Sequence, residues 1–124
     1  MLLKDFYTVK SLENEEDTKY LAHIFINEKH EIFNGHFPGN PIMPGVCMMQ
    51  IIKELAEQIS GKTLLMERLS NVKFMALINP EQTPDLRLEL EITTSEEHQI
   101  KLKNTTYFND TVALKLSSVY KIVS

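Results

Sequence analysis

One histidine of this chain lies at the head of a loop that is rich in proline and glycine. Residues 35–46 contain three prolines and three glycines, and His36 carries their one titratable side chain. Proline fixes the backbone φ angle and glycine widens its range, so the sequence of such a loop specifies its path. An imidazole held in one place can take up and return a proton near neutral pH, which is the chemistry of a general base. The alternative is a surface loop whose histidine merely titrates, but the length and order of the whole string favour a functional loop.

The element that must position this loop is a helix that starts directly after it. Pro44 and Gly45 open an amphipathic segment that ends before Gly61, which is typical helix punctuation. Val46 and Cys47 add apolar surface to the first turn, so the helix is expected to be buried all round at its start and half exposed later. Its free N–H groups face the loop, where they can hold a carbonyl oxygen or a developing oxyanion. The expected buried stripe consists of Met48, Ile51, Ile52, Leu55 and Ile59.

Residues 30–46 resemble the signature of the 3-hydroxyacyl-acyl carrier protein dehydratases, which are hot-dog-fold enzymes of fatty-acid synthesis. The order His-Glu-Ile-Phe-Asn-Gly-His-Phe-Pro-Gly-Asn-Pro-Ile-Met-Pro-Gly-Val is long and unusual, which makes the resemblance specific for this superfamily. A weaker similarity follows over residues 71–80, where the family has a strand with a lysine or arginine and a phenylalanine, ending in proline. The direct resemblance covers about residues 30–80.

The resemblance implies a role for several residues of the loop and the helix. His36 matches the catalytic histidine that removes a proton next to the thioester carbonyl. Gly45, with Val46 beside it, matches the helix start whose backbone N–H polarises that carbonyl. Gln50 stands where the family has a glutamate or aspartate that helps to expel the hydroxyl group as water. The implied lining of the acyl tunnel is Phe33, Phe37, Pro38, Pro44, Met49 and Phe74.

Gln50 is the main departure from the family pattern. Glutamine has nearly the shape of glutamate and can donate a hydrogen bond to a hydroxyl group, but it cannot deliver a proton. One positioned acid contributes roughly two to four orders of magnitude in rate, so a slow dehydratase, an isomerase that needs only His36 and a binding-only subunit are all open. Glu54, about 6 Å further along the helix where the family commonly has glutamine, is a possible substitute acid. A solvated Glu54 on a charged face with Lys53 and Glu57 is the favoured alternative.

The rest of the chain predicts a long antiparallel sheet. Leucines alternate with charged residues over 86–92, which indicates a half-buried strand, and two further long strands follow it. Long strands around one helix at about residues 45–60 predict an α+β fold, in agreement with the hot-dog fold, with residues 1–124 forming a single domain. The earlier strands are expected at 6–13, 19–27 and 71–78, and the turns at 14–17, 95–98 and 109–110.

The composition excludes several classes of function. The chain has 124 residues and a net charge of −4, and no basic cluster interleaved with aromatic residues, which argues against a nucleic-acid partner. No apolar run is long enough to span a bilayer and no leader is evident, so a soluble cytoplasmic protein without membrane contact is expected. The single Cys47 can form no internal disulfide and is expected to be a buried apolar residue. The spacing of His23, His30, His36 and His98 builds no metal site, so no metal is expected.

The resemblance also implies the partners of this chain. The acyl group would be carried on the phosphopantetheine of an acyl carrier protein, with no other cofactor. Carrier proteins are acidic, so a basic patch would dock one, although scattered solubilising charge is an equal alternative. The family dimerises, which predicts a homodimer, a trimer of dimers or a heterodimer with an intact dehydratase. A weakly active acyl-binding subunit and an acyl thioesterase are the alternative functions. The candidate docking residues are Lys53, Lys62, Arg68 and Lys73.

Overall fold

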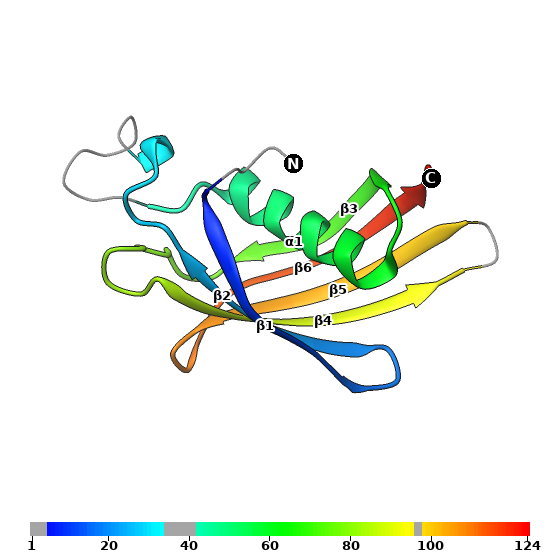
Figure 1. The fold of residues 1–124 in the computed structure, drawn as a ribbon, viewed down its shortest axis with the longest axis horizontal. Helices are drawn as coiled ribbons and strands as arrows, with labels where there is room; N and C mark the ends of the chain where they lie inside the picture. Colours follow the sequence, from blue (N-terminus) through cyan, green and yellow to red (C-terminus); the bar gives the residue numbers. More distant parts are fainter. Residues whose placement is uncertain (1–4, 34–41, 96–97) are drawn as a thin grey trace.

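In the computed structural model, one six-stranded antiparallel sheet wraps around one α-helix within the described part of the chain (Figure 1). The structure describes residues 5–33, 42–95 and 98–124. The strands lie in the order β1-β2-β4-β5-β6-β3, so β1 and β3 form the two edges of the sheet. The elements are β1 (Tyr7–Glu16), β2 (Lys19–Ile26), the 3-10 helix η1 (Glu31–Phe33), α1 (Gly45–Ser60), β3 (Leu64–Phe74), β4 (Asp85–Thr94), β5 (Gln99–Phe108) and β6 (Thr111–Ile122).

The helix α1 begins and ends where the sequence predicts. Pro44 precedes its first turn, and Gly61 closes it at a φ of 70°, where the Gly61 N–H donates to the Glu57 carbonyl over 2.9 Å. One prediction about the first turn is wrong, because Cys47 is buried but Val46 is 72% exposed. The sheet covers α1 from one side, which leaves Val46 facing outward. The predicted stripe is buried, with Met48, Ile51, Ile52 and Leu55 inside the core and Ile59 partly buried against it.

Strict alternation in the long strands builds the core beneath α1. Each of the four apolar residues of β4 faces the helix, and its neighbours in the strand are more exposed. Because burial of apolar surface is the main stabilising contribution to folding, this shared core holds α1 against the concave face of the sheet. The core side chains of β4, β5 and β6 include Leu86, Leu88, Leu90, Ile92, Ile100, Leu102, Leu114, Leu116 and Tyr120.

Two strand boundaries differ from the predictions. β1 runs on to Glu16, so most of the acidic stretch at 14–17 is strand, and the turn is made by Asp17 and Thr18 with Asp17 at a φ of 45°. An exposed edge strand accepts such charged residues without cost to the core. β3 spans Leu64–Phe74, earlier than the predicted 71–78, and its pairing with β6 contains two register shifts that disturb the alternation.

The two remaining turns connect the long strands. The predicted turn at 109–110 is confirmed, and Asn109 adopts the positive φ of 52° that such a turn requires. The turn predicted at 95–98 includes residues 96–97, which lie outside the described residues.

Candidate active site

Most of the loop rich in proline and glycine lies outside the described residues. His36, Phe37 and Pro38 fall within the undescribed stretch 34–41, so their roles as base and tunnel lining stay predictions. The described chain resumes at residue 42, three residues before α1.

An apolar groove of about 340 Å³ lies beside the first turn of α1. Its walls come from the start of α1, from the segment that follows β3 and from β6. Two backbone hydrogen bonds tie these walls together, since the Met43 N–H donates to the Ile78 carbonyl and the Met75 N–H donates to the Ala113 carbonyl, each over 2.8 Å. A concave apolar surface of this size fits a ligand with an extended apolar part. The residues that line it include Met43, Gly45, Met48, Phe74, Leu77 and Leu114.

Gly45 and Phe74, which both line this groove, are in direct contact. A Cβ atom added to Gly45 would lie 2.7 Å from Cζ of Phe74, closer than two non-bonded carbon atoms approach. Phe74 is 55% exposed, so its ring lies over the start of α1 while one side faces outward. The N–H groups of a first helical turn have no partner within the helix, so this end of the groove can bind an oxygen atom that carries negative charge.

A hydrogen-bonded cluster of three side chains lies further along α1. The Gln50 Nε2 atom donates to Glu54 Oε2 over 3.0 Å. The Tyr7 hydroxyl group, at the start of β1, donates to Glu54 Oε1 over 2.6 Å. All three side chains are half-buried. The favoured prediction of a solvated Glu54 is therefore wrong, because the fold places the Tyr7 hydroxyl group against its carboxylate and Gln50 lies one helical turn away.

Tyr7 is the site residue that the sequence did not reveal. It lies 47 positions before Glu54 in the chain, and only the fold brings the start of β1 beside α1 (Figure 1). Burial raises the pKa of the Tyr7 phenol far above its ordinary range, and the hydrogen bond to Glu54 and its negative charge raise the pKa further. Tyr7 therefore stays a neutral hydrogen-bond donor to Glu54 throughout the physiological pH range.

The groove and the cluster lie on different sides of α1. Gly45 and Gln50 are five positions apart, which corresponds to about 140° around a helix of 3.6 residues per turn. Gln50 is not among the residues that line the groove. Within the described residues of one chain, the structure therefore does not bring the helix N-terminus and Gln50 into one cavity.

The other predicted site residues have mixed surroundings. Phe33 is buried and stacks on Phe6 with 5.4 Å between the ring centroids, so it is part of the core. Pro44 and Met49 are half-buried at the start of α1. Cys47 is buried, and this burial raises the pKa of its thiol, which disfavours the reactive thiolate.

The three other histidines have separate surroundings in the described part of the chain. His23 is exposed on β2, with Nδ1 lying 3.1 Å from the Ser11 hydroxyl oxygen, and His98 is exposed in a turn. His30 packs edge-on against Phe6, with 5.1 Å between the ring centroids. Across residues 5–33, 42–95 and 98–124, no three potential ligands from His, Cys, Asp and Glu are grouped to hold a metal ion. No helix in these ranges is long and apolar enough to cross a membrane.

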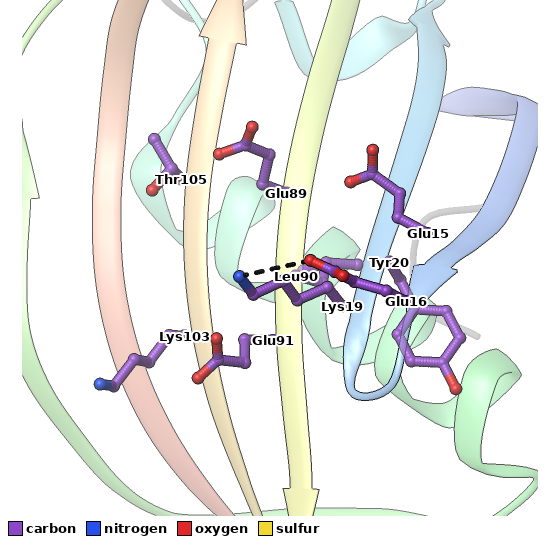
Figure 2. Close-up of a pocket in the computed structure, with 9 residues that line it drawn as sticks. All are labelled: Glu15, Glu16, Lys19, Tyr20, Glu89, Leu90, Glu91, Lys103 and Thr105. Carbon is purple, nitrogen blue, oxygen red and sulfur yellow. Dashed lines mark ion pairs between the residues drawn. The ribbon is translucent and has the colours of Figure 1, made fainter.

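A wider hollow of about 650 Å³ lies on the outer face of the sheet, away from α1 (Figure 2). Its walls are mostly charged, and two of the residues that line it, Lys19 and Glu16, form an ion pair of 3.9 Å. Glu89 and Glu91 point outward here because they alternate along β4 with leucines that face the helix. This open, charged surface has none of the predicted site residues in its walls.

Comparisons with known proteins define the class of this chain. Residues 12–115 match the ApeI-like family, described as ApeI dehydratase. The chain therefore belongs to the ApeI-like dehydratase family.

Relatives and solved structures agree with this class. The 3-hydroxyacyl-[acyl-carrier-protein] dehydratase FabZ of Caulobacter sp. is 30% identical over 109 residues, which are 81% of this chain and 64% of the relative. This chain thus spans less than two thirds of the length of that relative. The dehydratase heterocomplex ApeI:P from Xenorhabdus doucetiae superposes with a TM-score of 0.68 at 19% identity, covering 92% of this chain and 96% of that chain. A thioesterase from Pseudomonas aeruginosa superposes with a TM-score of 0.63 at 9% identity, covering 90% and 79%. The predicted hot-dog fold is confirmed.

Proposed function

We propose that this chain is a dehydratase that converts a 3-hydroxyacyl group on an acyl carrier protein into a trans-2-enoyl group and water. The observation that carries this proposal is the apolar groove that runs to the N-terminus of α1, where Gly45 lies against Phe74. The loop that contains His36 leads directly into this helix end. Membership of the ApeI-like dehydratase family supports the same reaction.

The reaction requires one base, one group that polarises the thioester carbonyl and one contact with the leaving hydroxyl group. In this proposal His36 takes a proton from C2, and the N–H groups of Gly45 and Val46 donate to the thioester oxygen as negative charge develops on it. Gln50 contacts the hydroxyl group at C3. The C3–O bond breaks as the C2=C3 bond forms, and the imidazolium of His36 returns its proton to the hydroxyl group, which leaves as water. These proton transfers need no cofactor.

The proposed site requires a second chain. In one chain the groove and the Gln50 cluster lie on different sides of α1, and β3 is an unpaired edge of the sheet. Val46 and Leu77, both at the groove end of the molecule, are each 72% exposed. Two copies that bring His36 of one chain towards α1 of the other would cover this apolar surface and complete the site. We therefore include a homodimer or a trimer of dimers in the proposal.

Docking of an acidic carrier protein is supported by basic residues on the outer face of the sheet, on the same strands that contribute to the groove. Lys73 precedes Phe74, and its Cα partner across β6 is Lys115; both line a shallow hollow together with Lys103. Directly opposed like charges destabilise a sheet, and an anionic partner would offset this cost. Lys115→Glu should therefore raise KM for a carrier-bound substrate but not for a pantetheine thioester. Of the docking residues expected from the sequence, Arg68 and Lys73 lie on β3, Lys53 is half-buried on α1, and Lys62 follows α1.

A partner subunit of an intact dehydratase is the second candidate function. Gln50 cannot deliver a proton, and the Xenorhabdus structural neighbour is described as a heterocomplex. In this alternative the purified chain is inert alone and active with a second chain. An acyl thioesterase has weaker support, because the likeness to a thioesterase at 9% identity concerns the fold alone.

Substitution of His36 tests the proposal. His36→Ala should abolish hydration of a 2-enoyl thioester, the reverse reaction, followed as loss of enoyl absorbance. The circular dichroism spectrum should stay unchanged, because the proposed role of the His36 side chain is proton transfer and not packing in the core. Activity within a factor of three of the unsubstituted chain would remove His36 from the mechanism.

A further inference from the structure

We infer that Glu54, anchored by Tyr7, is a positioning residue that fixes the side-chain amide of Gln50 so that the Gln50 carbonyl oxygen is free to accept a hydrogen bond from the substrate. The recognised chemical group is a hydroxyl donor at C3 of the acyl chain. This inference rests on the proposed function and names the substrate group that Gln50 binds.

The hydrogen bond with Glu54 determines the orientation of the Gln50 side-chain amide, that is, which of its NH2 group and its carbonyl oxygen faces Glu54. An ionised carboxylate only accepts hydrogen bonds, and a glutamine side chain has one donating end and one accepting end. The separation of 3.0 Å between the Gln50 amide and Glu54 Oε2 is a hydrogen bond only if the NH2 group faces the carboxylate. The opposite orientation would place two accepting oxygens against each other. The carbonyl oxygen of Gln50 is therefore turned away from Glu54.

Tyr7 holds the carboxylate in the position that makes this selection. Its hydroxyl group donates to the other oxygen of Glu54 over 2.6 Å, so both carboxylate oxygens are engaged. Tyr7 is itself fixed by its strand, since its Cα partner in β2 is Ile26 and the adjacent Phe6 is completely buried. A half-buried glutamate without this contact could adopt several rotamers. The rigid sheet thus fixes the Gln50 side chain through two hydrogen bonds, from Tyr7 to Glu54 and from Gln50 to Glu54.

A fixed carbonyl acceptor makes Gln50 selective. A 3-hydroxyacyl chain offers an O–H donor to it, whereas a saturated acyl chain leaves this polar oxygen without a partner in the occupied site. The same geometry limits the effect of restoring an acid at this position. Gln50→Glu alone would oppose two carboxylates, which then share a proton or move apart. The double exchange Gln50→Glu with Glu54→Gln keeps one amide and one carboxylate, and Tyr7 can still donate to the amide carbonyl oxygen introduced at position 54.

The test measures binding preference with ligands that are not turned over. The probes are the 3-hydroxyhexanoyl and hexanoyl amides of pantetheine, whose dissociation constants are measured by calorimetry. The unsubstituted chain should bind the hydroxylated amide roughly three- to tenfold more tightly, as expected for one hydrogen bond. Glu54→Gln should bring this ratio close to one, because the amide introduced at position 54 can donate to the Gln50 carbonyl oxygen. Tyr7→Phe should lower the ratio partly, and neither variant should bind the hexanoyl amide more weakly than the unsubstituted chain does.

A second tyrosine–glutamate pair provides the matched control. The Tyr107 hydroxyl group donates to Glu89 Oε1 over 3.0 Å on the outer face of the sheet. Tyr107→Phe and Glu89→Gln should leave the binding ratio unchanged. A ratio that is near one in the unsubstituted chain, or that persists in both Glu54→Gln and Tyr7→Phe, would overturn the inference. Equal weakening of both ligands would do the same, since it would indicate a merely structural role.

The outcome separates this inference from the proposed function. If the chain dehydrates 3-hydroxyacyl thioesters but the ratio of the two dissociation constants is unchanged by substitution of Glu54 and Tyr7, the proposed function holds and the positioning role fails. If the ratio depends on both residues while no thioester is turned over, the positioning role holds and the catalytic proposal fails. Should Glu54→Gln not fold, Tyr7→Phe gives the same decision, because it removes one hydroxyl group and leaves the charge in place.

Discussion

The Phe74 ring lies so close to Gly45 in the wall of the apolar groove that position 45 has no room for a side chain unless the ring moves. A Cβ atom at position 45 would meet the Phe74 ring at 2.7 Å. Because that ring is 55% exposed, it can swing outward, so Gly45→Ala should change the free energy of unfolding by no more than about 1 kcal/mol. The displaced ring no longer forms the groove wall, so turnover should fall at least roughly tenfold, as expected when the substrate is misplaced relative to the reacting groups.

A double-mutant cycle isolates the ring contact from other effects of the methyl group. In a Phe74→Ala background, Gly45→Ala should have little further effect on turnover, because the obstructing ring is absent. Gly61→Ala is the contrasting control. It has open space around it but a φ of 70°, so it should lower the unfolding free energy by about 1 kcal/mol without changing the kinetics. An unchanged effect of Gly45→Ala in the Phe74→Ala background would exclude the contact as the cause.

Single residues differ in how much the sequence reveals about them. The order of residues 35–46 was sufficient to predict the helix that follows the loop, while the role of the loop itself stays a prediction. The contact of Glu54 with Tyr7 was not predictable, because the two residues are 47 positions apart and Tyr7 does not stand out in its own segment. A half-buried tyrosine at the start of an edge strand has no periodic signal that indicates its partner.

At the scale of elements, local chemistry explains which boundaries were predictable. The ends of α1 were correct because Pro44 and Gly61 act on the backbone within one turn. The start of β3 was missed because register shifts at Met66/Arg68 and Ser70/Lys73 disturb the period of two. The turn of the first hairpin was also misplaced, because acidic residues are as compatible with an exposed edge strand as with a turn.

The hydrogen bond between β1 and α1 predicts a loss of stability at alkaline pH. The folded-state pKa of Tyr7 lies above its ordinary value, first through burial and then through Glu54, while the phenol of the unfolded chain ionises near pH 10. Above about pH 10 the unfolded state binds fewer protons than the folded state, so the free energy of unfolding falls as the pH rises. Below that pH the contribution is fully present. Urea unfolding at about pH 8 and about pH 11 should show a smaller decrease for Tyr7→Phe than for the unsubstituted chain. Equal decreases would show that Tyr7 ionises as freely in the folded state as in the unfolded one.

At the scale of the whole molecule, exposed apolar residues predict self-association. Leu77 is 72% exposed on the segment that lines the groove. Sedimentation equilibrium at micromolar concentration should give a dimer or a trimer of dimers for the unsubstituted chain. Leu77→Glu should shift this equilibrium to smaller species and reduce turnover in parallel, since the proposed site needs two chains.

Phe25→Glu is the matched control for this prediction. Phe25 is an exposed apolar residue of similar size, but it lies on β2, where it packs beneath the Lys10 ammonium group at 5.5 Å. Its substitution should leave the assembly unchanged. An unsubstituted chain that sediments as a monomer, yet turns over substrate at full rate, would contradict the shared site.

The measurement that tests the dehydratase assignment most directly follows two products in one mixture. The unsubstituted chain is incubated with a 3-hydroxyacyl thioester, and both enoyl absorbance and free thiol are recorded over time. The assignment predicts that the enoyl product appears without thiol release and that His36→Ala removes the signal. Thiol release without enoyl formation would instead indicate a thioesterase. The absence of both products from a folded homo-oligomer would equally contradict the assignment.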